Sequence, residues 1–557
     1  MEGKRTWGVK SYSGLIWCND DDDGTGAGAE NVGGTADSDD DGIKSYRDLE
    51  DFARLHIHIG GLQDPIATGA LQVGLEWRET NGTNPSIKVY QAAEIDGGDQ
   101  YLKTDLGAGN QALGSFATTL GTISVGGSFK FPVSFWQWNT NGLLNLSEDD
   151  PNRYLLFEGV TPGKGHLVLT IWKGNQKIGE GPGVWLDIKN IKEMYERVDS
   201  ATAHPWDNSV RFDPDPQEDK QNAIVFVHGW RMSPEGAGNF AETMYKRLWH
   251  RGYKGRFAAF HWDTHWHDGW QWLNDMGVNI GAVLANYNDS EYTAWHSASA
   301  LKNFVNGLSF PNKNIVAHSM GNIVAGEALR QGMQIKNYAL MQAAVPAACY
   351  DESDDIQQAT PYYHLTLKMW DNLTPDDDSD PETRALAYRG RFANVGGNLI
   401  NFFLPDDEAT SFAWEVNNDQ AKPDGPLADY YRYKRNNPSG EKLYRYHVEY
   451  IPTDPPTPYD VPDYYLSDPK HNYEAMAFAC RTWGKAVGAF GPTPTMVGTH
   501  GAIDDSIDLS DPAYQLPGVQ GSGFHDQHSG QFNANIQHLK PFYDILINRL
   551  DVGTPNP

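Results

Sequence analysis

The sequence has 557 residues, more than one ordinary domain holds, and this length predicts two or three separate cores. Its 73 acidic side chains outnumber the 44 basic ones and give a formal net charge of −29, which excludes a general electrostatic attraction to nucleic acid or anionic membranes. The three cysteines exclude a disulfide-rich scaffold, and no apolar run reaches the roughly 18 residues of a membrane helix.

Residues 1–50 form an Asp- and Gly-rich segment that is almost without large apolar side chains from residue 18 to residue 48. Such a segment cannot build a core of its own. Two stretches repeat the ligand spacing of a calcium-binding loop, each with a glycine at the sixth position, where the chain must bend sharply. The expected calcium ligands are Asn19, Asp21, Asp23 and Glu30, then Asp37, Asp39, Asp41 and Asp48. The alternative is an acidic, disordered linker whose spacing arises from composition alone.

Residues 51–200 predict a β-rich accessory domain, most simply a sandwich, because short apolar runs alternate with Gly, Asn and Asp clusters. The clearest hairpin covers residues 166–178, with a turn at Gly174 and Asn175. Apolar residues at three- and four-residue spacing predict a short amphipathic helix from Ile191 to Val198. The proline-containing stretch 201–220 predicts a linker.

Residues 221–557 predict an α/β domain, because apolar strand-like runs alternate with helical patterns. The expected architecture is a mostly parallel sheet with helices on both faces. An insertion rich in Tyr and Pro is expected at about 415–515, either as a wall of a binding pocket or as decoration. Residues 536–550 carry the apolar spacing of a final amphipathic helix.

Residues 314–322 predict a buried strand, a tight turn and the start of a helix, with Ser319 at the turn. The small neighbours Ala317 and Gly321 permit the cramped backbone that such a turn requires. The helix directs its positive N-terminal end and the backbone N–H of Met320 toward the place where an oxyanion develops in acyl transfer. Ser319 is therefore the predicted nucleophile, and the alternative is a serine that only caps the helix.

The sequence AHSMG at 317–321 resembles the nucleophile elbow of α/β-hydrolase esterases and lipases, with Ala317 in place of the usual first glycine. Upstream, AIVFVHGW at 223–230 is similar to the His-Gly loop of this family, which implies that the backbone N–H of Trp230 is the second oxyanion donor. The resemblance covers roughly 222–414 and 515–557. It implies an α/β-hydrolase catalytic domain and a triad in the order serine, acid, histidine.

That order places the acid at the end of a later strand, and the apolar run 399–404 is followed by two aspartates. The histidine is expected in the loop before the final helix, where a neutral imidazole would accept the serine proton. The candidates are Asp407, with Asp406 and Asp371 as alternatives, and His528, with His525 as the alternative.

The predicted function is hydrolysis of carboxylic esters, including lipid or polyester substrates, without an organic cofactor. Two alternatives stay open: the same triad acting on thioesters or amides, and a surface binding or adhesion protein with a vestigial hydrolase domain. Weak calcium loops fill best at extracellular calcium levels, so a secreted or cell-surface location is expected, with a leader removed from the sequence. The spacing of His261, His265 and His267 matches no common zinc motif.

Overall fold

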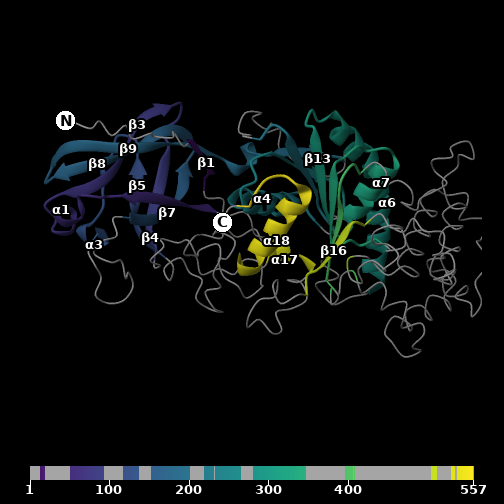
Figure 1. Cartoon of the computed structure of the whole chain (residues 1–557). Helices are drawn as coiled ribbons and strands as arrows, with labels where there is room; N and C mark the ends of the chain where they lie inside the picture. The colour runs from purple at the N-terminus through teal and green to yellow at the C-terminus, as the bar shows by residue number, and fades with distance from the viewer. Residues whose placement is uncertain are drawn as a thin grey trace, which may run out of the picture.

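The computed structural model contains three β-sheets, of which two lie in the N-terminal part of the chain and one in the C-terminal part. Figure 1 shows the two N-terminal sheets, in purple and blue, beside the third sheet and its helices. No helix in the described part of the chain is long and apolar enough to cross a membrane. The structure describes residues 13–18, 51–92, 117–136, 152–200, 219–230, 232–264, 280–345, 395–404, 407, 410, 488, 503–510, 528–533 and 536–555.

The first sheet has the strand order β1-β9-β8-β3-β6 and the second has the order β2-β7-β4-β5. Every pairing is antiparallel except that of β1 with β9. The strands are β1 (Ser13–Trp17), β2 (Phe52–His58), β3 (Gln72–Asn81), β4 (Ser86–Ala92), β5 (Ala117–Ser124), β6 (Phe129–Lys130), β7 (Asn152–Thr161), β8 (Gly163–Lys173) and β9 (Gln176–Lys189), with short helices α1 (Gln63–Ala67) and α3 (Val133–Trp136) between them.

One apolar cluster collects side chains from both N-terminal sheets, including Val73 of β3 and Val89 of β4. Along a strand, every second side chain points to the same face, so each sheet contributes one face to this cluster. The predicted hairpin at 166–178 is confirmed as the turn between β8 and β9, where Lys173 pairs with Gln176. Gly174 has φ 58°, a left-handed conformation that favours glycine at this turn.

The third sheet is entirely parallel, with the order β10-β12-β11-β13-β14-β15-β16, which confirms the expected parallel sheet in an α/β arrangement. Its strands are β10 (Glu196–Asp199), β11 (Asn222–Val227), β12 (Arg256–His261), β13 (Asn312–His318), β14 (Asn337–Met341), β15 (Leu399–Phe403) and β16 (Asp505–Asp508). The helices of this half are α4 (Pro234–His250), α6 (Ile280–Gly307), α7 (Gly321–Arg330), α17 (Gly530–Asn533) and α18 (Ile536–Leu550).

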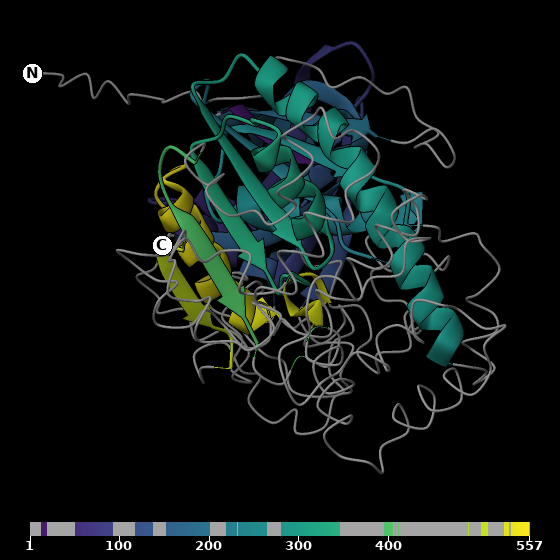
Figure 2. The same cartoon turned by 90° about the vertical axis from the view of Figure 1, so that its right-hand side faces the viewer.

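Helices pack on both faces of the parallel sheet, which explains why its central strands, β11 to β15, carry apolar runs without alternation. On β13, Ile315 belongs to the apolar cluster that includes α6 and α7. Its neighbour Val316 points the other way and joins the cluster of α4 and α18. In Figure 2 the long teal helix α6 and the yellow helix α18 lie on opposite sides of the strands. Helix α18 spans the residues predicted for the final helix.

Two sequence-based expectations near residue 195 are wrong. Strand β10 pairs with β12, with Glu196 opposite Ala258, so it belongs to the parallel sheet and not to the accessory domain that the range 51–200 assigned. The helix expected at 191–198 is only a 3₁₀ turn over Ile191–Glu193, followed directly by β10. The apolar spacing arises because Ile191, Met194 and Tyr195 pack into the cluster around α4.

The segment 1–50 also contributes a strand, which its composition did not predict. Strand β1 pairs with β9, with Ser13 opposite Trp185 and Trp17 opposite Lys189. Ile16 and Trp17 of β1 are buried. Residues 13–17 are therefore part of the first N-terminal sheet.

A buried ion pair joins the two halves of the chain. Lys246 Nζ on α4 lies 2.6 Å from Asp51 Oδ1, and neither side chain has any solvent exposure. The indole Nε1 of Trp17 donates to the same carboxylate oxygen at 2.7 Å. Phe52 of β2 and Leu156 of β7 belong to the same apolar cluster as the buried side chains of α4. The halves therefore share one core instead of meeting through a solvated interface.

We expect Lys246→Met to lower the free energy of unfolding by about 3–5 kcal/mol, because it leaves the Asp51 carboxylate buried without its cation. Urea unfolding of the whole chain measures this loss. Replacing both charges in Asp51→Leu/Lys246→Met should recover much of it, since no isolated charge is then buried.

The matched control is Lys164→Met, which removes the partly exposed pair of Lys164 with Asp187, where the Nζ–Oδ2 distance is 3.5 Å. An exposed pair of this kind should change stability by no more than about 1 kcal/mol. Equal losses in Lys164→Met and Lys246→Met would contradict a shared core held by the buried pair.

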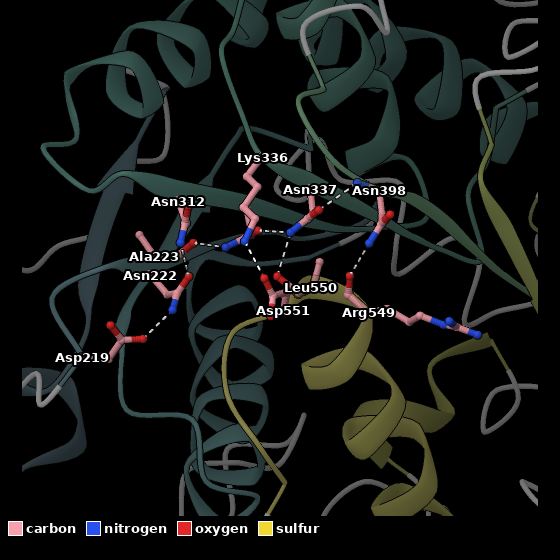
Figure 3. Close-up of polar contacts among 11 residues, drawn as sticks. Asp219, Asn222, Ala223, Asn312, Lys336, Asn337, Asn398, Arg549, Leu550 and Asp551 are labelled. Carbon is pink, nitrogen blue, oxygen red and sulfur yellow. Dashed lines mark hydrogen bonds and ion pairs between the residues drawn. The ribbon is translucent and has the colours of Figure 1, made fainter.

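At the amino ends of the parallel strands, asparagine side chains cap the C-terminus of α18 (Figure 3). Asn337 Nδ2 donates to the Leu550 carbonyl at 2.7 Å, and Asn398 Nδ2 donates to the Arg549 carbonyl at 3.0 Å. The last carbonyls of a helix have no partner within the helix, so these bonds satisfy them. The backbone N–H of Asn398 donates to Asn337 Oδ1 at 2.8 Å, which links the two caps. Helix α18 is thereby fixed to this edge of the sheet.

Candidate active site

The opposite edge of the sheet, at the carboxyl ends of the strands, contains a topological switch point. Strands β11 and β13 are hydrogen-bonded neighbours, with Val227 opposite Ala317. The chain leaves β11 for α4 on one face and leaves β13 for α7 on the other. Loops that diverge in this way leave a crevice in which open α/β sheets bind their ligands. Ser319 and the loop 228–230 both lie at this position.

Ser319 has φ 52°, a left-handed conformation that residues other than glycine rarely adopt. Its N–H donates to the Met341 carbonyl of β14 at 2.9 Å, and its carbonyl accepts from the N–H of Ala344 at 3.1 Å. A strained residue persists only when the surrounding structure fixes it on several sides. The end of β14 provides that restraint from one side.

Asn322 restrains the same turn from the helix side. Its Nδ2 donates to the carbonyls of Ala317, at 3.0 Å, and Ser319, at 2.9 Å. The Tyr338 hydroxyl donates to Asn322 Oδ1 at 2.8 Å, and the Asn322 side chain is fully buried. Asn322 was not among the residues that the sequence pattern singled out. The available signal was a single asparagine among the apolar and small residues at the start of the predicted helix.

Two glycines allow the turn after β13 and the loop after β11 to touch. A Cβ at Gly321 would lie 2.4 Å from the His228 carbonyl oxygen and 2.6 Å from that of Val227. A Cβ at Gly229 would lie 3.0 Å from both the Ser319 Cβ and His318 Nδ1. The first contacts are impossible for a side chain and the second are very tight. Close backbone approach therefore explains Gly321, and tight packing against two side chains explains Gly229.

His228 fixes the direction of the loop that follows β11. Its Nε2 accepts from the backbone N–H of Trp262 at 3.2 Å, so Nδ1 carries the proton and donates to the Gly229 carbonyl at 2.8 Å. Burial, together with the neighbouring His261, holds the pKa of His228 well below its ordinary value, so the ring is neutral. The C=O and N–H of a trans peptide point in opposite directions. Tethering the Gly229 carbonyl therefore sets where the Trp230 N–H points.

Asp407 and His528 meet directly, although 121 residues separate them in sequence. His528 Nδ1 lies 2.6 Å from Asp407 Oδ2, and Asp407 is fully buried just beyond β15. Burial raises the pKa of Asp407, but the charge and hydrogen bond of His528 and the hydrogen bonds of Thr410 outweigh it, so this pKa is lowered. An ionised carboxylate at Nδ1 keeps the proton there and leaves Nε2 as the basic nitrogen.

His318 brings His528 next to the nucleophile turn. His318 Nε2 donates to the His528 backbone carbonyl at 2.8 Å, and the two imidazole centroids are 4.8 Å apart. A hydrogen bond from the Ser319 hydroxyl to His528 is not among the contacts of the described residues. Such bonds are often long until substrate is bound. Ser319, Asp407 and His528 thus lie at one edge of the sheet, as a serine-acid-histidine arrangement requires.

The side chain of Trp230 connects the same loop to α6. Its indole Nε1 donates to Ser290 Oγ at 2.9 Å, and this hydroxyl donates to the Thr264 carbonyl at 2.9 Å. The Trp230 ring is partly buried against the apolar cluster of α6 and α7. Met320 is the N-cap residue of α7, on the other side of the crevice. The two expected oxyanion donors therefore flank the point where β11 and β13 end.

Of the three histidines considered as zinc ligands, only His261 lies in the described part of the chain, and its Nδ1 lies 3.2 Å from Asp199 Oδ1. Among the described residues, no group of three or more His, Cys, Asp and Glu side chains could hold a metal ion. The residues outside the described part are Asp371, Asp406, His525, His265, His267 and the eight expected calcium ligands, Asn19, Asp21, Asp23, Glu30, Asp37, Asp39, Asp41 and Asp48, together with most of the expected insertion.

Comparison with known proteins gives only a distant likeness. No family model matches the sequence, and no curated protein matches it. Among solved structures, the chain is similar to the orthorhombic crystal form of acylaminoacyl peptidase from Pyrococcus horikoshii, with 13% identity and a TM-score of 0.18. The match covers 43% of this chain and 44% of that chain. A likeness this distant assigns neither a substrate nor residue roles.

We expect His318 to make the fold sensitive to acid. Burial lowers its pKa from 6.5 to about 3. Between these values the unfolded chain binds one more proton, so the free energy of unfolding is retained above pH 6.5 and decreases as the pH falls toward 3. One proton corresponds to about 1.4 kcal/mol per pH unit. His318→Gln should therefore reduce the slope of the free energy of unfolding against pH by about 1.4 kcal/mol per pH unit. Urea unfolding between about pH 6 and pH 4 measures this slope.

The control for this measurement is His296→Gln, which changes an exposed histidine on α6. It should leave the slope of stability against pH unchanged. If His318→Gln and the wild-type chain lose stability in parallel as the pH falls, the acid sensitivity does not come from His318.

Proposed function

We propose that this protein is a serine hydrolase of the α/β-hydrolase type that cleaves carboxylic ester bonds. The observation that carries the proposal is the pair of buried Asp407 with His528 at 2.6 Å, beside a serine held at φ 52°. The proposal includes a sandwich-like accessory domain formed by the two N-terminal sheets, whose side chains share one apolar cluster.

In the proposed reaction, Ser319 Oγ attacks the ester carbonyl carbon while Nε2 of His528 accepts the hydroxyl proton. Asp407 stays ionised and stabilises the imidazolium that forms. The backbone N–H groups of Trp230 and Met320 hold the oxyanion of the tetrahedral intermediate. His528 then returns the proton to the leaving alcohol. Water, activated by the same imidazole, hydrolyses the acyl-enzyme and restores Ser319.

The choice of an ester as substrate rests on the likeness of the Ser319 and His228 motifs to those of esterases and lipases. The fold and the triad alone do not select the leaving group, because the same residues serve all acyl transfers. The acyl chain is proposed to occupy the crevice between the two loops, with the Trp230 indole beside it. The hydrogen bond from the Trp230 indole to Ser290 fixes the position of this ring.

We expect the chain to release p-nitrophenol from esters of graded chain length, and Ser319→Ala to lower kcat by about 10⁶-fold. Asp407→Asn should lower kcat by about 10⁴-fold, because an amide at this position favours the wrong imidazole tautomer. His528→Ala should abolish turnover, whereas His525→Ala should leave most of it.

Ser299→Ala serves as the matched serine control, because Ser299 is exposed on α6. It should hydrolyse the esters at the wild-type rate. Parallel assays with thioesters and p-nitroanilides test the other leaving groups. Equal rates in wild type and Ser319→Ala would remove the assigned nucleophile, and a wild-type chain inert toward all three substrate classes would favour the vestigial binding protein.

We also propose that the N-terminal loops bind calcium in a structural role and that the protein is secreted or displayed at the cell surface. The ligand spacing of residues 19–30 and 37–48 and the net charge of −29 support this. Chelation with EGTA should lower Tm more than it lowers ester hydrolysis, and Asp21→Asn/Asp39→Asn should give the same shift without the chelator. A Tm unchanged by EGTA would contradict a structural calcium site.

A further inference from the structure

Gln342 is a buried polar residue with a strained backbone directly after β14. Its φ is 38°, and its side chain is only 1% exposed. Among the described residues other than glycine, only Ser319 and Asp551 share a positive φ. Strain of this kind is maintained when the rest of the structure requires a particular direction of the chain. The proposed reaction assigns Gln342 no part.

The Gln342 side chain forms a reciprocal amide pair with Gln531. Gln342 Nε2 donates to Gln531 Oε1 at 3.1 Å, and Gln531 Nε2 donates to Gln342 Oε1 at 3.0 Å. Both side chains are buried, so removing the Gln342 amide would take a hydrogen-bond partner from the buried Gln531 amide. Gln531 lies in α17, three residues after His528. The pair therefore connects the end of β14 to the loop that carries the proposed base.

The same loop is fixed to the body of the domain at Gln531 and Phe532. The Gln531 carbonyl accepts from Arg247 Nη1 at 2.7 Å and from the Tyr543 hydroxyl at 2.9 Å. The ring of Phe532 stacks on Phe240 of α4 with centroids 4.5 Å apart. Gln531 is thus fixed in place, and its amide pair with Gln342 can set the position of His528.

The backbone of Gln342 and its neighbours is hydrogen-bonded to the segments that hold the proposed nucleophile and acid. Its neighbour Met341 accepts the Ser319 N–H at 2.9 Å. The N–H of Gln342 itself donates to the Phe402 carbonyl at the end of β15, 3.0 Å away. Beyond that point, the Leu404 carbonyl accepts the N–H of Asp407 at 3.0 Å. One strained residue therefore links the backbone supports of all three proposed triad members.

We propose that Gln342 is a positioning residue that sets the separation between the Ser319 hydroxyl and the His528 imidazole. This inference rests on the proposed function. The left-handed turn sends the Gln342 amide toward Gln531, while the preceding residue keeps its bond to Ser319. Without the amide pair, the loop that carries His528 can shift relative to the Ser319 hydroxyl. A misplacement of about 1 Å between reacting groups lowers rates by about 10²-fold.

The first test is Gln342→Met, which keeps the length and volume of the side chain but removes the amide pair. The second-order rate of Ser319 labelling by a fluorophosphonate and kcat for a p-nitrophenyl ester should both fall, by about 10²-fold. KM should stay within about twofold, because the acyl-binding surface is untouched. Gln531→Met should give the same losses, and the double variant should not add to them.

The control for loss of stability is Asn398→Ala, which removes the cap on the Arg549 carbonyl at the far edge of the sheet. It should lower Tm while leaving the labelling rate at the wild-type value. If Asn398→Ala loses as much labelling as Gln342→Met at a matched Tm, the effect is general destabilisation and the proposal is overturned.

Gln342→Glu provides a second, independent measurement. A protonated carboxyl group reproduces both bonds of the pair, with its O–H donating to Gln531 Oε1 and its C=O accepting from Gln531 Nε2. The ionised carboxylate has no donor and repels Gln531 Oε1. The ratio of Gln342→Glu to wild-type kcat should therefore rise as the pH falls, whereas the ratio for Gln342→Met should stay level. A level ratio for both variants would overturn the proposal.

The outcomes separate this inference from the proposed function. Wild-type chain labelled at Ser319, together with equally fast labelling of Gln342→Met, overturns the positioning role alone. Absence of Ser319 labelling in the wild-type chain overturns the proposed function and the positioning role with it.

Discussion

The close contact between the turn after β13 and the loop after β11 is the constraint on which the rest of the site depends. At Gly321 the two backbones approach so closely that no side chain fits between them. This contact is possible because β11 and β13 are adjacent parallel strands whose following helices lie on opposite faces of the sheet. Beside this contact, β14 and Asn322 hold the strained turn at Ser319, and His228 holds the Gly229 carbonyl. The expected oxyanion donors, the backbone N–H groups of Trp230 and Met320, belong to these two segments.

The electrostatics of the site follow from burial. His228 and His318 are both enclosed, and burial lowers the pKa of each, so neither competes for a proton at neutral pH. The Asp407 carboxylate stays ionised because His528 and Thr410 hydrogen-bond to it. The ionised Asp407 carboxylate is thereby held against Nδ1 of His528, 2.6 Å away. The neutral histidines act through fixed hydrogen bonds and hold backbone carbonyls in place.

Local sequence patterns predicted the features that depend on neighbouring residues. The turn at Ser319, strands β11 and β13 and helix α18 are each encoded by residues that are close in sequence, and the structure contains all of them. The catalytic roles of Asp407 and His528 stay predictions, although the two side chains meet. Contacts between distant segments could not be predicted in this way. Gln342 and Gln531 are 189 residues apart, and Asp51 meets Lys246 only because the two halves share a core.

At 191–198 a local pattern was present but predicted the wrong element, because its three- and four-residue spacing indicated a helix. Packing against α4 produced a helical pattern in a segment that forms a turn and an edge strand.

Helix α18, which Asn337 and Asn398 fix to the sheet, is synthesised long after the nucleophile turn. The segment with Ser319 leaves the ribosome some two hundred residues before the loop of His528, since 210 positions separate His318 from His528. Under the proposed function, the growing polypeptide stays inert until helix α18 docks against the finished sheet, and translation itself delays the onset of hydrolysis.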